Sequence, residues 1–288
     1  MSLTSILFRI GAGKSDRKRD SQIPFPAGVK QWNDISYGPH GKDNLLDVYR
    51  PLNAGKCPII VNVHGGGYVY GDKELYKRYC MDLARRGFAV VNFNYRLAPR
   101  WKFPAPLEDL NNVMHWIRTE GYWFGDTEKV FMVGDSAGAQ LTSQYAAMLH
   151  NLEYMSHFRF SHPGIFLRAN GLNCGMYDMS SQASAKRTGL HRDYLGKQLS
   201  ANDPRVFALE AIGGNYPPTH ITTACHDFLR ECAQPMYDFL TEKGIPCRLD
   251  CYGSEEDESI GHVFHINIIT PTAIECNDTQ CDFFRQYL

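Results

Sequence analysis

A serine flanked by small residues stands where a buried strand is predicted to end. In VGDSAGAQ, Ser136 lies between Gly134 and Gly138, after the apolar run KVFMVGD and before a stretch with helical spacing. A sharp strand-to-helix turn of this kind presents the serine hydroxyl at a helix N-terminus, which favours developing negative charge. The pattern predicts a nucleophilic serine. The same residues also fit an ordinary serine at a helix N-cap.

A serine hydroxyl is a weak nucleophile at neutral pH, so it needs a base, and the base needs an acid to orient it. The chain order that accompanies this turn is serine, acid, histidine. Asp227 ends the run THITTACHD, and His262 lies in a loop after the next predicted strand, CRLDCYG. We therefore predict a catalytic triad of Ser136, Asp227 and His262.

Other residues could fill the same roles. His226 and His265 are rivals for the base, and Asp178 and Asp250 are rivals for the acid. We interpret His265 as a packing residue at the start of the next element. His226 should point to the opposite side from its neighbour Asp227 in an extended segment.

A run of glycines, HGGGY at residues 64–68, directly follows the predicted strand PIIVNV. Backbone N–H groups can approach a substrate oxygen closely where no Cβ intervenes, and such a loop supplies donors for a developing oxyanion. We expect His64 to brace the loop and Gly67 to allow its turn. The predicted oxyanion donors are the N–H groups of Gly65, Gly66 and Ala137. The residues expected to line the substrate pocket are Tyr68, Asp135 and Val263.

Nothing in the sequence calls for a cofactor or a metal. No Gly-Lys-Ser/Thr follows the glycine run, and a second candidate at Gly13–Ser15 has Phe8 where a phosphate loop needs glycine. The histidines of HVFH and the pair Cys225–His226 lack a second cluster with zinc spacing. We therefore expect neither a bound nucleotide nor a metal ion.

Composition narrows the partners and the compartment. The 288 residues are 43% apolar and carry 30 basic and 31 acidic side chains, a net charge of −1. This balance argues against nucleic acid and membrane partners. The partner expected from the predicted serine chemistry is a small-molecule ester, with a homodimer as an open possibility. No membrane-spanning run or secretory signal is visible, and the nine cysteines are scattered. We expect a cytoplasmic protein with reduced thiols.

Strand-like and helix-like stretches alternate along most of the chain. This pattern predicts an α/β protein with a mostly parallel central sheet, helices on both faces and a small cap. We expect an exposed N-terminal arm at residues 1–30, which could contribute to the cap, and a main domain at 31–288. An insertion at about 176–215 breaks the alternation and could form a lid; an ordinary surface excursion is the alternative. Internal ion pairs are expected between Arg96 and both Glu108 and Asp109.

Five motifs in order, HGGGY, NYRLAP, GDSAGA, HDFLRE and GHVF, resemble the hormone-sensitive-lipase-like branch of the α/β-hydrolases, in particular small bacterial carboxylesterases and acetylesterases. The resemblance runs from about residue 35 to the end. It implies an α/β-hydrolase sheet, hydrolysis of short-acyl esters by the same triad and oxyanion donors, and no cofactor. The chain departs from the family pattern at Val263, where glycine is frequent. The short N-terminal segment implies a more open site.

The leading interpretation is a serine carboxylesterase for short acyl groups, including acetyl groups on sugars. An amidase or formamidase would use the same triad, because the tetrahedral intermediate is shared. A non-catalytic binding protein that kept the fold is a further alternative. A lipase acting at lipid interfaces is also conceivable, although no long amphipathic lid is visible in the sequence.

Overall fold

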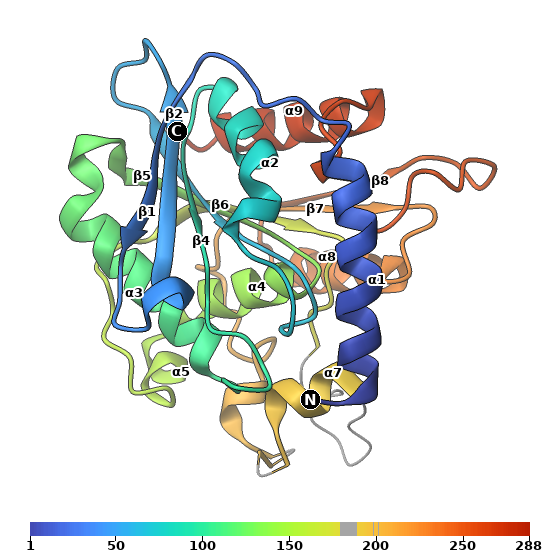
Figure 1. Ribbon diagram of the computed structural model, residues 1–288. Coiled ribbons are helices and arrows are strands. Elements are labelled where there is room, and N and C mark those ends of the chain that lie inside the picture. Colours follow the sequence, from blue (N-terminus) through green and yellow to red (C-terminus); the bar gives the residue numbers. More distant parts are fainter. Residues whose placement is uncertain (179–188, 198, 201) are drawn as a thin grey trace.

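Strands and helices alternate along the chain, and the strands form one central sheet (Figure 1). The computed structural model describes residues 1–178, 189–197, 199–200 and 202–288. Within these residues, eight strands pair in the order β1-β2-β4-β3-β5-β6-β7-β8. The pairs β1–β2 and β2–β4 are antiparallel and the later pairs are parallel. The strands are β1 (Val29–Ser36), β2 (Leu45–Pro51), β3 (Pro58–Val63), β4 (Ala89–Phe93), β5 (Asp126–Asp135), β6 (Leu167–Asn173), β7 (Thr219–Ala224) and β8 (Cys247–Tyr252).

Helices cover both faces of the sheet, as Figure 1 shows. One apolar cluster joins α2 and α9 to one face, and a second joins α3, α4 and α8 to the other. The prediction of a mostly parallel α/β fold is thereby confirmed. The helices are α1 (Leu3–Asp20), α2 (Lys73–Arg85), α3 (Ala105–Glu120), α4 (Ala137–His150), α5 (Leu152–Ser156), α7 (Gly189–Leu195), α8 (Ala233–Glu242) and α9 (Pro271–Arg285).

The central strands carry the most continuous apolar sequences. Every residue of β4 is buried, as is every residue of β3 after its first. Strands covered by helices on both faces need such runs, since neither face meets water. Pro235 is tolerated inside α8 because this helix begins at Ala233 and the first helical turn requires no donor there.

The N-terminal segment differs from an exposed arm. Its first part forms α1, an 18-residue helix capped by the Ser2 side chain, which accepts a hydrogen bond from the Ser5 N–H. Arg9 Nε donates to Val69 O at 2.6 Å, and the Tyr70 hydroxyl donates to Asp16 at 2.8 Å. These contacts attach α1 to the segment that follows the glycine run, so the helix lies over that part of the molecule.

The insertion at about 176–215 is only partly described, because residues 179–188, 198 and 201 lie outside the described ranges. Its described parts include α7 and a short 3₁₀ turn at Pro204–Val206. The predicted ion pairs of Arg96 are confirmed: its guanidinium contacts Glu108, and its Nε lies 2.9 Å from Asp109 Oδ1. Across the described ranges, no helix combines the length and the hydrophobicity that crossing a bilayer requires.

Candidate active site

Ser136 occupies a strained turn between β5 and α4. Its φ of 53° and ψ of −119° lie outside the regions that L-residues usually adopt. A Cβ at Gly134 would lie 2.4 Å from Gly138 O, and a Cβ at Gly138 would lie 2.0 Å from Val63 O. Both neighbours must therefore be glycine. Ser136 stands at the N-cap position of α4, but its side chain makes no capping hydrogen bond, so a simple capping role does not describe it.

The predicted base and acid both lie at this turn. His262 Nε2 is 3.0 Å from Ser136 Oγ, and His262 Nδ1 is 2.6 Å from Asp227 Oδ1. The carboxylate of Asp227 also accepts the Leu229 N–H at 2.9 Å and the Thr223 hydroxyl at 3.0 Å. Burial would raise the pKa of Asp227, but these hydrogen bonds, led by that of His262, lower it overall. An ionised Asp227 can thus orient the imidazole.

The rival residues lie elsewhere. His226 Nε2 contacts the backbone oxygen of Glu255 at 3.1 Å, and Asp250 bonds His220 at 2.8 Å. His265 is fully buried, with its ring 5.2 Å from that of Tyr79, and burial lowers its pKa to about 3. Asp178 is exposed. The imidazole that lies within hydrogen-bond distance of Ser136 Oγ is that of His262.

Two neighbours of His262 were not foreseen from the sequence. The ring of Phe228, an exposed side chain, lies 4.1 Å from the imidazole and covers it. Cys174, which directly follows β6, is buried beside the acid. Its Sγ, a carboxylate oxygen of Asp227 and a ring nitrogen of His262 lie within 4.8 Å of one another. Two of the three groups in this cluster already bond to each other. Only the position of Phe228, next to Asp227 in sequence, offered a signal.

The glycine loop corrects one predicted donor. The Gly65 N–H donates to the Tyr76 hydroxyl at 3.1 Å, so it is engaged inside the protein rather than presented to a substrate. Gly66 and Gly67 have φ of 111° and 57°, which favour glycine. In the described part of the chain, the N–H groups of these two glycines have no hydrogen-bond partner. Ala137 is the first residue of α4, so its N–H has no intrahelical acceptor.

His64 braces the loop, as its sequence position suggested. Its Nδ1 lies 2.8 Å from Gly65 O, and its ring stacks on Tyr95 at 4.1 Å. Burial lowers the pKa of His64 to about 4, so the ring is neutral at pH 7. A Cβ at Gly66 would lie 2.0 Å from Tyr70 O. The loop is therefore a close-packed turn that fixes the direction of its amides.

Asp135 precedes the serine and is the buried acceptor behind the loop. It is 1% exposed and its Oδ2 accepts the Tyr76 hydroxyl at 2.7 Å. Its Oδ1 is buried without a hydrogen-bond partner among the described residues. Burial raises the pKa of Asp135 to about 6. The chain Asp135–Tyr76–Gly65 thus fixes the start of the glycine loop, and Tyr76 is a positioning residue that the sequence did not reveal.

The raised pKa of Asp135 predicts a pH-dependent stability. Between pH of about 4 and 6, the folded chain retains a proton on Asp135 that the unfolded chain releases, so this residue makes stability fall as pH rises through that window. We expect Asp135→Asn to reduce the fall in unfolding free energy between pH 4 and 7 by about 3 kcal/mol. Urea unfolding of both chains at the two pH values measures it.

Asp126→Asn is the matched control for this measurement. Asp126 lies at the other end of β5, and its pKa is lowered: burial would raise it, but hydrogen bonds from Glu128 and Lys56 lower it overall. A carboxyl group whose pKa is lowered in the folded chain stabilises the fold as pH rises, which is the opposite of the effect of Asp135. Replacing Asp126 therefore cannot mimic the replacement of Asp135. An unchanged pH dependence in Asp135→Asn would refute the assigned protonation.

A cavity of about 330 Å³ adjoins the serine and is mainly apolar. The pocket expectations for Tyr68, Asp135 and Val263 agree with its lining. Tyr68 stacks on Tyr194 at 3.9 Å, and Val263 has a φ of 54°, an unusual conformation for a β-branched residue. The lining residues from the N-terminal helix are Phe8, Ala12, Ser15, Asp16 and Arg19. The site is therefore more enclosed than the short N-terminal segment suggested.

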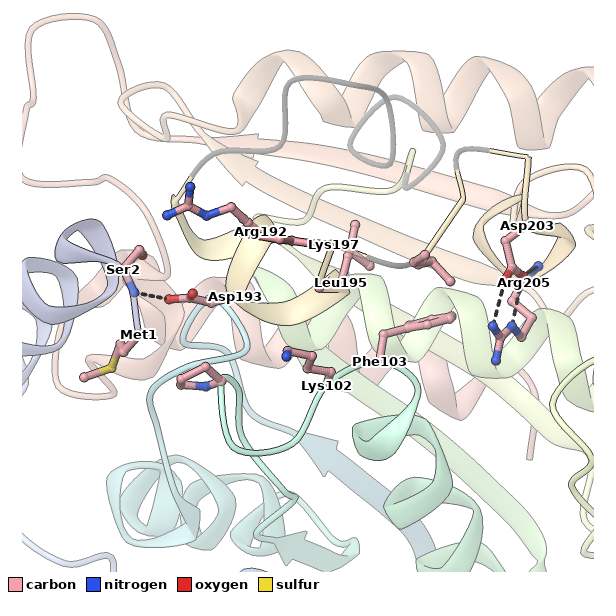
Figure 2. Close-up of a pocket in the computed structure, with 13 residues that line it drawn as sticks. Met1, Ser2, Lys102, Phe103, Arg192, Asp193, Leu195, Lys197, Asp203 and Arg205 are labelled. Carbon is pink, nitrogen blue, oxygen red and sulfur yellow. Dashed lines mark hydrogen bonds and ion pairs between the residues drawn. The ribbon is translucent and has the colours of Figure 1, made fainter.

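A larger hollow of about 900 Å³ lies beside α7 and contains neither Ser136 nor His262 (Figure 2). Asp193 at its wall accepts the Ser2 N–H at 2.6 Å and the Ser5 hydroxyl at 2.7 Å. Figure 2 shows the first of these bonds between the start of the chain and α7. The hollow thus marks where α1 is anchored, and the serine pocket is the better candidate for chemistry.

The sheet order, the strained serine turn and the adjacent imidazole define an α/β-hydrolase. Residues 60–266 match the family described as alpha/beta hydrolase fold, and the chain belongs to this family. The resemblance inferred from the five motifs is thereby confirmed.

Named relatives and solved structures agree with this assignment. Versiconal hemiacetal acetate esterase of Dothistroma septosporum is 29% identical over 69% of this chain and 65% of its own length. Esterase LipQ of Mycobacterium tuberculosis is 29% identical over 55% of this chain and 38% of its own length. The chain thus spans less than two thirds of either relative. A structure of esterase B from Lactobacillus Rhamnosis superposes with a TM-score of 0.86 at 23% identity, covering 96% of this chain and 92% of that one. This last likeness concerns the fold.

Proposed function

We propose that the chain is a serine carboxylesterase that hydrolyses short-chain acyl esters, with acetyl-type esters as the preferred class. The observation that carries the proposal is the continuous hydrogen-bonded series from Ser136 Oγ through His262 to Asp227, at 3.0 and 2.6 Å. One relative is named for an acetate ester, which supports the acyl class. The mechanism uses side chains and amides of this chain alone.

In the proposed mechanism, His262 Nε2 accepts the proton of Ser136 while Oγ attacks the ester carbonyl carbon. The resulting imidazolium is stabilised by ionised Asp227, whose pKa is lowered despite its burial. The same proton passes to the departing alkoxide, which leaves as the alcohol. A water molecule then attacks the acyl-serine with His262 again as base, and the acid is released.

The oxyanion of each tetrahedral intermediate needs donors that are already oriented. We assign this role to the N–H groups of Gly66, Gly67 and Ala137, in place of the Gly65 N–H that bonds Tyr76. The start of a helix adds a favourable field at Ala137. The loop needs no rearrangement to form this cradle, because its turn is fixed by packing against Tyr70.

An oxyanion role for Gly66 predicts a large effect of one methyl group. Gly66→Ala should lower kcat by about 10²–10³, because the new Cβ would collide with Tyr70 O and the displaced amide could no longer face the oxyanion. Kinetics with p-nitrophenyl acetate measure the effect. Gly55→Ala is the control, since a Cβ there meets nothing within 4 Å. Equal activity of the Gly66 variant and wild type would show that the Gly66 N–H is not an oxyanion donor.

The pocket size predicts the acyl-length profile. A cavity of about 330 Å³ bounded by Phe8 on the α1 side has little room beyond a short acyl group and its alcohol. We expect kcat/KM for p-nitrophenyl esters to fall by at least about tenfold between butyrate and octanoate. Phe8→Ala should restore part of the octanoate rate. A profile that rises with chain length would contradict the short-acyl assignment.

We propose a broader range for the alcohol portion of the substrate than for the acyl portion. Asp16, Arg19 and Tyr70 place hydroxyl, carboxylate and guanidinium groups on the wall of the pocket, which suits an alcohol bearing further hydroxyls, such as a sugar. Acetylated monosaccharides would test this.

An amidase or formamidase uses the same intermediates, and paired ester and formamide assays separate the two activities.

The proposal includes a cytoplasmic location, which fractionation of cells expressing the chain would test.

A further inference from the structure

The outer face of α1 carries an unusual run of exposed apolar side chains. Leu3, Leu7 and Ile10 are 70%, 60% and 52% exposed and recur at the spacing that places residues on one side of a helix. Single exposed apolar residues are common on protein surfaces, but a contiguous set on one element indicates an interaction surface. The first half of α1 therefore presents an apolar stripe to the outside.

The same face becomes basic in the second half of the helix. Lys14, Arg17 and Lys18 continue the stripe at helical spacing and are exposed. Among the described residues, these three side chains have no ion-pair partner. The net charge of −1 for the whole chain hides this local separation of an apolar segment from a cationic one.

The opposite face of α1 forms part of the serine pocket. Phe8, Ala12 and Arg19 line the cavity from that side. Phe228, which is 73% exposed, lines the same cavity and lies over His262. In Figure 1, α1 stands as a separate column with α7 beside its N-terminal end. One helix thus separates the pocket from the stripe.

We propose that the outer face of α1 binds the protein peripherally to an anionic phospholipid surface. Apolar side chains that enter the headgroup region, flanked by cations that meet anionic headgroups, are the features by which a helix lies in such an interface. The bound protein would hold the pocket that α1 borders close to the lipid surface. This revises the expectation of no membrane partner, which rested on net charge.

A second copy of the chain fits this face less well. Antiparallel pairing of two α1 helices would place the apolar half of each against the basic half of the other. Parallel pairing would bring Lys14, Arg17 and Lys18 of both copies together, and like charges repel. A lipid surface of negative charge accepts both halves at once.

Vesicle sedimentation tests the proposal without using catalysis. Wild type and Ser136→Ala should both sediment with vesicles of phosphatidylcholine and phosphatidylglycerol at low salt. High salt should release both proteins from these vesicles, and neither should sediment with vesicles of pure phosphatidylcholine. Replacing Lys14, Arg17 and Lys18 together by Gln should weaken binding about 100-fold, at about fivefold for each cation. Leu7→Asp with Ile10→Asp should abolish binding and leave hydrolysis of p-nitrophenyl acetate unchanged.

Leu152→Asp is the matched control, because Leu152 is a 66% exposed leucine at the start of α5. It should bind vesicles as wild type does. The proposal is overturned if wild type stays in the supernatant with the anionic vesicles, or if Leu152→Asp loses binding as the α1 variants do. It is also overturned if sedimentation velocity shows a dimer that Leu7→Asp with Ile10→Asp dissociates, because a second copy then occupies the face.

Discussion

Ser136→Ala is expected to lower kcat for p-nitrophenyl acetate by about 10⁶, equivalent to about 8 kcal/mol of transition-state stabilisation. The hydroxyl at 3.0 Å from His262 Nε2 is the only group in the proposed mechanism that forms a bond to the substrate. Its loss leaves the oxyanion amides and the pocket, which alone give a residual rate above that in water. Steady-state kinetics and labelling by a fluorophosphonate probe measure the two consequences.

Ser143→Ala is the matched control on the same helix. Ser143 is buried, and its hydroxyl lies 3.1 Å from the hydroxyl of Tyr216, which places it in packing rather than at the pocket. This variant should label with the probe and hydrolyse the ester as wild type does. If Ser136→Ala retained wild-type turnover, or if the probe labelled a residue other than Ser136 in the wild type, the esterase proposal would be wrong.

The serine turn was predictable because its constraints are local. Gly134 and Gly138 are required by contacts with backbone oxygens a few residues away or on the adjacent strand, so the motif itself carries the geometry. Asp227 and His262 were placed by chain order and by the rule that sites form where parallel strands end. These features depend on the sheet, and strand-helix alternation was sufficient to predict a mostly parallel sheet with helices on both faces, although not its strand order.

Contacts between distant elements could not be predicted in the same way. The Gly65 N–H bonds Tyr76 of α2, and this bond depends on how α2 docks against β3 and β5. Such a contact leaves no trace in the spacing of residues. Without it, the glycine run alone gave no reason to prefer one pair of amides over another.

The N-terminal segment was expected as an arm that could contribute to the cap, and its helical form was missed for a different reason. The apolar periodicity of α1 faces outward, whereas sequence analysis interprets such periodicity as a buried face. Apart from Phe8, its inner face carries small and polar residues, with Ser5 and Gly13 as its buried positions. The contacts of Arg9 with Val69 and of Asp16 with Tyr70 hold it in place. A helix attached mainly by polar contacts resembles an exposed arm when only its composition is considered.

Asp227→Asn is expected to lower kcat by about 10⁴ while the fold is retained. In the wild type, the carboxylate accepts the proton on His262 Nδ1, so Nε2 is free to accept the serine proton. An amide can instead donate to Nδ1 and favour the tautomer that carries its proton on Nε2. That tautomer cannot act as a base toward Ser136, and no carboxylate remains to stabilise the imidazolium. Kinetics with p-nitrophenyl acetate, alongside circular dichroism, measure the loss.

Asp250→Asn separates the catalytic acid from its rival. Asp250 carries the same charge near the end of the neighbouring strand, β8, but it bonds His220 and Arg248 rather than His262. Its replacement should lower stability, because buried His220 loses its carboxylate hydrogen-bond partner, and should leave kcat unchanged. If Asp250→Asn abolished turnover and Asp227→Asn did not, the acid would have been assigned to the wrong strand end, and the hydrogen bond at 2.6 Å between Asp227 and His262 would be structural rather than catalytic.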